Sequence, residues 1–402
     1  MALAPNVYDA ESIPPAARAD IDRLLTSGDL FRYTAPSDAP VTLLEQDFAA
    51  LMGVKYALAV SSCSAAIFLG LRALDLAPGT RVLIPAFTFA AVPSAIVHAN
   101  CQPVLVEVGE NYRIDMADFK AKLDTTIGAV IISHMRGHTS DMDAIMALCD
   151  AAGVPVIEDA AHSLGTLWHD RKIGTIGAMG CFSFQSYKLV NAGEGGILIS
   201  NDPDLVARAV IMSGAYEHNW KKHGNDPALN AAFAKWQNEL PLYNMRMQNL
   251  SAAVIRPQLP EVARRVRDGR ANHDYVARLL NTSPWMYVPD ALSPETRAPD
   301  SIQFNLVGFD TDTQAQMFAD AAEARGVKVQ IFGLSTDNAR AFWNWRFIPG
   351  GQPDLPQTRE MLMRACDVRL PARLKQPELD FIVHALLSAA EDVMGETRAY
   401  GT

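Results

Sequence analysis

Residues 180–200 read GCFSFQSYKLVNAGEGGILIS, two short apolar runs on either side of a polar loop. The runs at 181–184 and 196–200 are too short and too apolar for surface segments, so we expect two buried strands. Lys188 comes shortly after the first run and precedes the glycine-rich stretch 192–196. Desolvation beside a buried strand lowers the pKa of a lysine and makes its amine nucleophilic. This stretch therefore predicts a reactive lysine at the end of a sheet strand.

The same alternation of short apolar runs and longer helical stretches extends from about residue 55 to residue 212. Further strands are predicted at 56–60, 81–84, 103–107, 129–133 and 155–158. Helices are predicted between them, at 64–74, 90–99 and 141–152. This order is typical of βαβ units. We therefore expect an α/β domain with a mainly parallel central sheet, whose functional site lies at the carboxyl ends of the strands.

The last third of the chain has a different pattern. Residues 249–280 are rich in Ala, Arg and Leu but contain Pro257 and Pro260, which predicts a kinked connecting helix. A strand at 302–309, a helix at 313–325, a second strand at 327–332 and a closing helix at 377–393 follow. We expect two domains: residues 1–248 form an N-terminal segment and the large α/β domain, and residues 249–402 form the connecting helix and a small α+β domain.

Composition excludes several classes of protein. The chain has 35 Lys and Arg against 45 Asp and Glu, a net charge of −10, which argues against nucleic acid as a partner. Five scattered cysteines without CxxC spacing predict reduced, buried thiols, with neither a disulfide framework nor a metal site. Residues 1–8 lack an export signal, and no apolar run reaches the ~18 residues of a membrane span. We therefore expect a cytoplasmic protein that does not bind membranes.

Two further clusters stand at the ends of predicted strands. Residues 61–64, SSCS, end one strand and open a helix, where N–H groups and hydroxyls hold a phosphate or simply cap the helix. Asp159 follows the apolar run 154–157, and a buried carboxylate needs a cationic partner, either an arginine or the protonated ring nitrogen of a cofactor. An anion-binding helix start, a buried aspartate and a reactive lysine are together what pyridoxal 5'-phosphate requires.

With these residues the chain resembles the DegT/DnrJ/EryC1/StrS family of sugar aminotransferases, pyridoxal-phosphate enzymes of fold type I. The likeness runs through most of the chain. It is carried by VSSCSAAI from Val60, PAFTFAA from Pro85, SDMDAI from Ser140, VIEDAAHSLG from Val156, GCFSFQSYKLVNAGEGG from Gly180 and NMRMQNLSAAVIRPQL from Asn244.

The resemblance implies roles for four residues around the cofactor ring. Lys188 would carry pyridoxal 5'-phosphate as a Schiff base and then act as general acid and base. Asp159 would keep the pyridine nitrogen protonated. Phe89 would stack on the ring, and His162 would contact the phenolic oxygen of the cofactor. As alternatives, Phe89 is an ordinary core residue and His162 only satisfies a buried backbone group.

The resemblance also implies how the phosphate is held and how the protein assembles. Ser64, Ser183 and the backbone at Cys63 would bind the phosphate. Asn244 would reach in from the partner subunit of a homodimer with shared active sites; as an alternative, it is a turn residue.

Several positions depart from the family pattern. Cys63 stands where the family usually has glycine. Arg136 and His138 lie in a segment that replaces an aromatic-Gly run, and Arg246 ends a motif that reads Asn-Met-Arg. These three side chains suit a carboxylate or phosphate on the substrate, or else they pair with acidic neighbours. Residues 216–244 show no clear period and predict a long loop, which either grips a substrate through its Trp and Lys residues or forms a surface lid.

The function implied by the resemblance is amino transfer. An amino acid such as glutamate or glutamine would donate nitrogen to a keto group of a sugar, nucleotide sugar, cyclitol or related metabolite. Two alternatives stay open: a dehydrating, ring-aromatising enzyme of the same family that keeps the lysine, and a regulatory protein that binds the cofactor without turnover.

Overall fold

The structure of the chain is a computed structural model that describes residues 4–34, 38–224 and 226–400. The first three residues of the expected N-terminal segment and the last two of the expected C-terminal domain lie outside these ranges.

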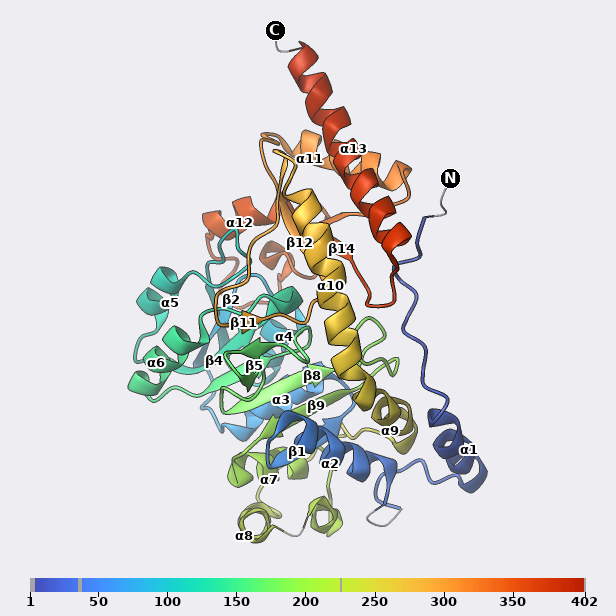
Figure 1. Cartoon of the computed structure of the whole chain (residues 1–402). Helices are drawn as coiled ribbons and strands as arrows, with labels where there is room; N and C mark the ends of the chain where they lie inside the picture. Colours follow the sequence, from blue (N-terminus) through green and yellow to red (C-terminus); the bar gives the residue numbers. More distant parts are fainter. Residues whose placement is uncertain (1–3, 35–37, 225, 401–402) are drawn as a thin grey trace.

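Within the described residues, the largest sheet has seven strands in the order β1-β9-β8-β5-β4-β2-β3 (Figure 1). Their bounds are β1 Tyr56–Val60, β2 Arg81–Pro85, β3 Gln102–Val106, β4 Ile127–Ser133, β5 Val156–Asp159, β8 Met179–Ser183 and β9 Gly196–Ser200. β9 runs antiparallel to both of its neighbours, and the other pairs in the sheet are parallel. The predicted α/β class with a mainly parallel sheet is confirmed, and each of the seven predicted strands is present within a few residues of its expected position.

Helices cover both faces of this sheet (Figure 1). The helices of this part are α1 Ala17–Ser27, α2 Pro40–Met52, α3 Cys63–Ala73, α4 Ala91–His98, α5 Met116–Lys122, α6 Met142–Ala152, α7 Pro203–Met212 and α8 Pro227–Trp236. Alternate residues of a strand face opposite ways. In β4, Ile131 therefore belongs to the core cluster that contains α3, α4 and α7, whereas Val130 belongs to the cluster on the other face, which contains α2 and α6. Because the sheet is buried on both faces, its open edge at the strand ends is where a ligand has access.

The C-terminal part builds a second, smaller sheet of four strands in the order β10-β12-β14-β13 within the described residues. Its strands are β10 Met286–Tyr287, β12 Ser301–Leu306, β13 Gln330–Ile331 and β14 Ala365–Arg369, and its helices are α11 Asp312–Ala324, α12 Pro356–Leu362 and α13 Gln376–Tyr400. A short third sheet joins β11 Glu295–Thr296 to β6 Leu167–Trp168 and β7 Arg171–Lys172, so it ties the C-terminal part to the large one.

A kinked helical connection joins the two parts. It consists of α9 Asn249–Ile255, a 3₁₀ turn Arg256–Glu261 that contains both prolines, and α10 Val262–Leu280, which runs up to the small sheet in Figure 1. Core residues from Ala252 to Val266 pack with the large sheet, and the core of the small sheet begins with Val276. The domain division at residue 249 stays a prediction. In the structure, the residues that pack with the large sheet give way to those that pack with the small sheet within α10.

Two sequence expectations differ from the structure. The predicted loop 216–244 contains α8, which Asp226 caps and whose Leu229 and Phe233 are buried. Trp220 is buried in the same cluster, so it packs inside the protein instead of facing a ligand. The strand β14 was not predicted, because the charged residues Asp367 and Arg369 interrupt its short apolar run.

The described part of the chain contains no helix with the length and apolar character needed to cross a lipid bilayer. The five cysteines are buried, as predicted.

Candidate active site

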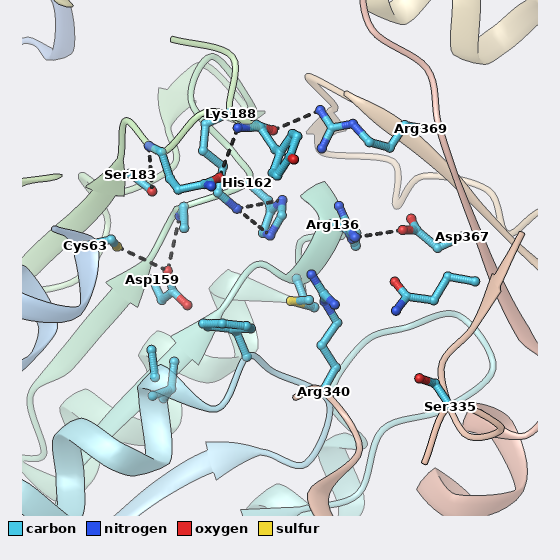
Figure 2. A pocket seen from close by; sticks show the side chains of 18 of the residues that line it. Cys63, Arg136, Asp159, His162, Ser183, Lys188, Ser335, Arg340, Asp367 and Arg369 are labelled. Carbon is cyan, nitrogen blue, oxygen red and sulfur yellow. Dashed lines mark hydrogen bonds and ion pairs between the residues drawn. The ribbon is translucent and has the colours of Figure 1, made fainter. Parts of the chain in front are cut away.

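A cavity of about 860 Å³ opens between the carboxyl ends of the large sheet's strands and the small sheet (Figure 2). Side chains from both parts of the chain line it. Of the residues singled out from the sequence, it brings together Cys63, Ser64, Phe89, Arg136, Asp159, His162, Ser183 and Lys188. The ends of β1, β2, β4, β5 and β8 supply these residues, which is the arrangement expected for a parallel sheet.

Lys188 lies in the loop between β8 and β9. Backbone hydrogen bonds from Phe184 N to Gly195 O and from Lys188 N to Gln185 O, each 2.9 Å, hold this loop in place. Burial is the main reason that the pKa of the Lys188 ammonium falls from 10.5 to about 8, although the nearby Asp300 carboxylate opposes the shift. About a tenth of such lysines carry a free amine at pH 7, far more than for an ordinary lysine. The predicted reactive lysine thus has a structural basis.

His162 is the direct neighbour of this amine. Its Nε2 atom lies 2.8 Å from Lys188 Nζ (Figure 2). Burial and the positive charge of Lys188 hold the pKa of His162 well below its ordinary value. The imidazole is therefore neutral at physiological pH, so it offers one N–H donor and one acceptor to the cavity.

Asp159 ends β5 and is 6% exposed. Its carboxylate accepts hydrogen bonds from Ser133 Oγ at 2.8 Å and from Ala161 N at 3.1 Å, and the Cys63 thiol lies 3.8 Å away. Among the described residues it forms no ion pair. A buried carboxylate at a cavity wall without a cationic partner fits a ligand that brings the cation, as the protonated pyridine nitrogen of pyridoxal 5'-phosphate does.

The start of α3 is the predicted phosphate cradle. Ser62 is the N-cap and accepts a hydrogen bond from Ala65 N, which leaves the N–H groups nearer the helix start free for an anion. Gly196 of β9 passes so close that a Cβ there would lie 2.2 Å from the carbonyl carbon of Ser62. Cys63 is accommodated in place of the family's usual glycine, and its side chain is buried against Asp159.

Phe89 follows β2 and lines the cavity with an exposed fraction of 45%. A ring buried in the core would not be this accessible, so Phe89 is not an ordinary core residue, and its stacking role stays a prediction. Ser183, at the end of β8, also lines the cavity, and its hydroxyl accepts from Gln185 N at 3.3 Å.

Arg136 lines the cavity, but an acidic neighbour already pairs with it. Its guanidinium lies 2.7 Å from Asp367 of β14, and both side chains are buried. The backbone of Arg136 has a φ of 55°, a conformation that non-glycine residues adopt mainly where function or tertiary packing requires it. Arg136 therefore joins the large sheet to the small one across the cavity.

The other two predicted substrate residues do not line the cavity. His138 is buried, and its Nε2 lies 2.9 Å from Gln303 Oε1 of β12, because the turn at Arg136 directs the two side chains to different surroundings. The Arg246 guanidinium donates to Gly214 O at 2.8 Å and packs over Phe31 and Tyr216. Asn244 is exposed and also lies outside the cavity of its own chain.

Sequence reasoning missed several charged residues at the site, among them Asp300, Arg340, Asp367 and Arg369 of the C-terminal part. Asp367 and Arg369 alternate along β14, and Arg369 donates to Tyr187 O at 2.9 Å, beside Lys188. Asp367 and Arg369 are two residues apart in a short apolar run, and this spacing could have predicted a strand with both side chains on one face. Asp300 faces Lys188 from a small recess, and Arg340 lies in an aperiodic segment, so neither had a local signal.

Comparison with known proteins identifies the family. A sequence profile of the DegT/DnrJ/EryC1/StrS aminotransferase family matches residues 21–387. The chain is 33% identical over 259 residues to the spore coat polysaccharide biosynthesis protein SpsC of Bacillus subtilis (strain 168). This alignment covers 63% of this chain and 64% of that protein. It is 32% identical over 227 residues to a GDP-perosamine synthase of Vibrio cholerae, with coverage of 56% and 58%. Each alignment spans less than two thirds of the relative's length.

The fold extends over almost the whole chain. The crystal structure of 3-amino-5-hydroxybenzoic acid (AHBA) synthase superposes with a TM-score of 0.82 at 24% identity, covering 96% of this chain and 99% of that one. The predicted architecture, a large sheet domain followed by a small α+β part, is the fold of that structure.

Proposed function

Because this chain belongs to the DegT/DnrJ/EryC1/StrS aminotransferase family, we propose that it transfers an amino group from an amino-acid donor to a keto group. The acceptor would be a sugar, nucleotide sugar, cyclitol or related metabolite, and glutamate or glutamine would be the donor. The observation that carries this proposal is the shared cavity of Lys188, an amine of lowered pKa, and Asp159, a buried carboxylate without a cation.

Pyridoxal 5'-phosphate is the cofactor that these residues fit. When bound, it supplies an electron sink for the carbon that carries the amino group. Lys188 would hold it covalently and, once released, would carry the proton of the 1,3-shift on Nζ, from the carbon that bears the amino group to the carbon on the other side of that nitrogen. Asp159 would hold the proton on the ring nitrogen, Phe89 would support the ring, and the start of α3 would bind the phosphate. His162 would orient Lys188 Nζ at 2.8 Å.

The family relationships support a sugar-derived acceptor. One relative is named for spore coat polysaccharide biosynthesis and another as a GDP-perosamine synthase.

A homodimer with shared sites is also part of the proposal, as is a cytoplasmic location. Asn244 is exposed, yet its segment lies next to the phosphate cradle, because Ser61 N donates to Met245 O at 2.8 Å. We infer that the exposed Asn244 amide would enter the cavity of a second copy instead of that of its own chain.

Absorbance spectroscopy tests the catalytic proposal. The protein loaded with pyridoxal 5'-phosphate should show the band of the lysine-bound cofactor, and one of L-glutamate, L-glutamine and L-alanine should convert it to the amino form. Lys188→Ala should lack the lysine-bound band. Lys120→Ala, at an exposed lysine of α5, is the matched control. A wild-type protein that holds the cofactor but is converted by no amino donor would favour the regulatory alternative.

Mixing two inactive variants tests the shared sites. Subunits with Lys188→Ala and subunits with Asn244→Ala should each be weak or inactive alone. If Asn244 acts in the partner's site, a mixed dimer has one site with both changes and one intact site, so mixing restores activity. If Asn244 acts within its own chain, a mixed dimer has two damaged sites and no activity returns.

A further inference from the structure

A second half of the cavity lies beyond the residues expected to hold the cofactor. Five cationic side chains and three carboxylates line the whole cavity: Arg136, Lys188, Lys328, Arg340 and Arg369 against Asp159, Glu194 and Asp367. This cationic excess is local, because the chain as a whole has a net charge of −10. A cationic pocket in an acidic protein concentrates anionic ligands.

The arginines of this half differ in what they bind. Arg136 pairs with Asp367 at 2.7 Å, and Arg369 donates to Tyr187 O at 2.9 Å and packs over the Tyr187 ring. The guanidinium of Arg340 joins no ion pair in the described part of the chain, and its Nε atom is buried without a hydrogen-bond partner. Arg369 also joins no ion pair there, but its guanidinium has the Tyr187 carbonyl as a hydrogen-bond partner. Among the described residues, Arg340 is thus the arginine at this cavity whose guanidinium has neither an ion pair nor a hydrogen bond.

The backbone around Arg340 is built to hold it there. Arg340 N donates to the side chain of the buried Asn338, and Asn344 donates back to Asn338 O at 3.0 Å. The carbonyl of Ala339 accepts from Ala90 N and from Trp345 Nε1, each at 2.9 Å. These bonds anchor the turn to the start of α4.

This anchoring places the charge beside the expected cofactor site. The guanidinium carbon of Arg340 lies 5.7 Å from the centre of the Phe89 ring. In Figure 2 the Arg340 side chain reaches into the space that His162 and Arg136 also face. Burial and the neighbouring Arg136 lower the pKa of Arg340 to about 10, so it is still cationic at neutral pH. A partly buried, unpaired cation is unfavourable unless a ligand supplies the counter-ion.

We propose that Arg340 binds a carboxylate of the substrate, so that this site selects an acidic substrate. The proposal rests on the proposed function. A guanidinium matches a carboxylate through two parallel N–H···O bonds. The carboxylate comes from the amino donor or from the acceptor, and the two sources are separable by experiment.

Binding of glutarate, a dicarboxylate without an amino or keto group, tests the site without turnover. Calorimetry on the cofactor-loaded protein compares the wild type with Arg340→Gln, Arg340→Lys and Arg346→Gln. Arg346 is the matched control, because it is exposed and lies six residues further along the same segment. Arg340→Gln should raise the dissociation constant of glutarate about ten- to a hundredfold, because that is the usual effect of losing a hydrogen bond to a charged group. Arg340→Lys should lie in between, and Arg346→Gln should match the wild type.

The donor half-reaction then identifies the source of the carboxylate. If Arg340→Gln raises the apparent dissociation constants of both L-glutamate and L-alanine, Arg340 binds the α-carboxylate of the donor. If it raises the constant of L-glutamate alone, Arg340 binds the side-chain carboxylate of glutamate. If glutarate binding falls while both donors are unaffected, the carboxylate belongs to the acceptor.

Unchanged glutarate and donor binding in Arg340→Gln would overturn the proposal, provided that its cofactor spectrum and melting temperature match the wild type. If Arg340→Gln does not fold, Arg340→Lys decides, because it keeps the charge but loses the two parallel N–H···O bonds: glutarate binding as tight as in the wild type overturns the proposal. If instead the proposed function is wrong, no donor converts the cofactor of the wild-type protein. The glutarate titration still tests Arg340 in that case, because it needs no turnover.

Discussion

The lowered pKa of Lys188 makes a prediction that needs no cofactor. With a pKa of about 8 instead of 10.5, roughly 9% of the amine is free at pH 7, against about 0.03% for an unshifted lysine, a factor of roughly three hundred. Labelling of Lys188 by a neutral amine reagent such as fluorodinitrobenzene should therefore rise with pH and level off above a midpoint near 8.

The midpoint should respond to neighbouring charges with opposite signs. The Asp300 carboxylate raises the pKa of Lys188 and the Arg136 guanidinium lowers it. Asp300→Asn should therefore move the midpoint to lower pH, and Arg136→Gln should move it to higher pH, each by less than about one unit. Asp310→Asn, at an exposed aspartate, should leave it unchanged.

Mass spectrometry of a digest, after labelling of the cofactor-free protein at several pH values, reports the rate at Lys188. The same digest contains the exposed Lys120 as an internal reference. A Lys188 midpoint near 10.5, or shifts of the wrong sign in the two variants, would refute the reasoning that burial and these two charges set its reactivity.

Three further substitutions test the support of the site. Asp159→Asn should slow the donor half-reaction about a hundredfold or more in stopped-flow absorbance, because a neutral amide does not hold the proton on the ring nitrogen. Glu45→Gln should lower the free energy of unfolding by about 3–5 kcal/mol in urea titrations, since it leaves the buried Arg32 without its bidentate partner. Gly196→Ala should weaken retention of the cofactor on dialysis, because a Cβ there meets Ser62 at 2.2 Å and must displace the phosphate cradle.

The substitutions at Glu45 and Gly196 each have a control on the same chain. Asp124→Asn, at the exposed pair with Arg81, should change stability by less than about 1 kcal/mol. Gly395→Ala, where a Cβ meets nothing within 4 Å, should keep the cofactor bound. Equal effects at the control and the test positions would show that the substitutions act non-specifically.

The cofactor half of the site was predictable because its signals are local. Asp159 ends β5 and Lys188 lies in the loop that follows β8, and both strands are recognisable from a few apolar residues. Parallel strands bring their carboxyl ends to one edge of the sheet. Even the choice between adjacent carboxylates follows from strand alternation: Glu158 points into the protein, where three backbone N–H groups bind it, and Asp159 points to the cavity.

The substrate half was not predictable because tertiary contacts determine it. Arg340 has no periodic context, and it reaches the cavity only because Ala90 N binds the carbonyl before it. His138 follows Arg136 by two residues, but the left-handed turn at Arg136 separates their surroundings. The strand β14 was also not predicted, since the charged residues Asp367 and Arg369, which line the cavity, break its apolar run.

Isotope exchange within a single donor pair tests the central claim, amino transfer at Lys188, without knowledge of the acceptor. The loaded protein is incubated with nitrogen-15-labelled L-glutamate and carbon-13-labelled 2-oxoglutarate, and the glutamate is analysed by mass spectrometry. Wild-type protein should produce glutamate that carries both labels, and Lys188→Ala should not. The same design with glutamine and alanine and their keto acids covers the other donors. Protein that holds its cofactor on Lys188 yet forms no doubly labelled amino acid from any of the three pairs would contradict the account.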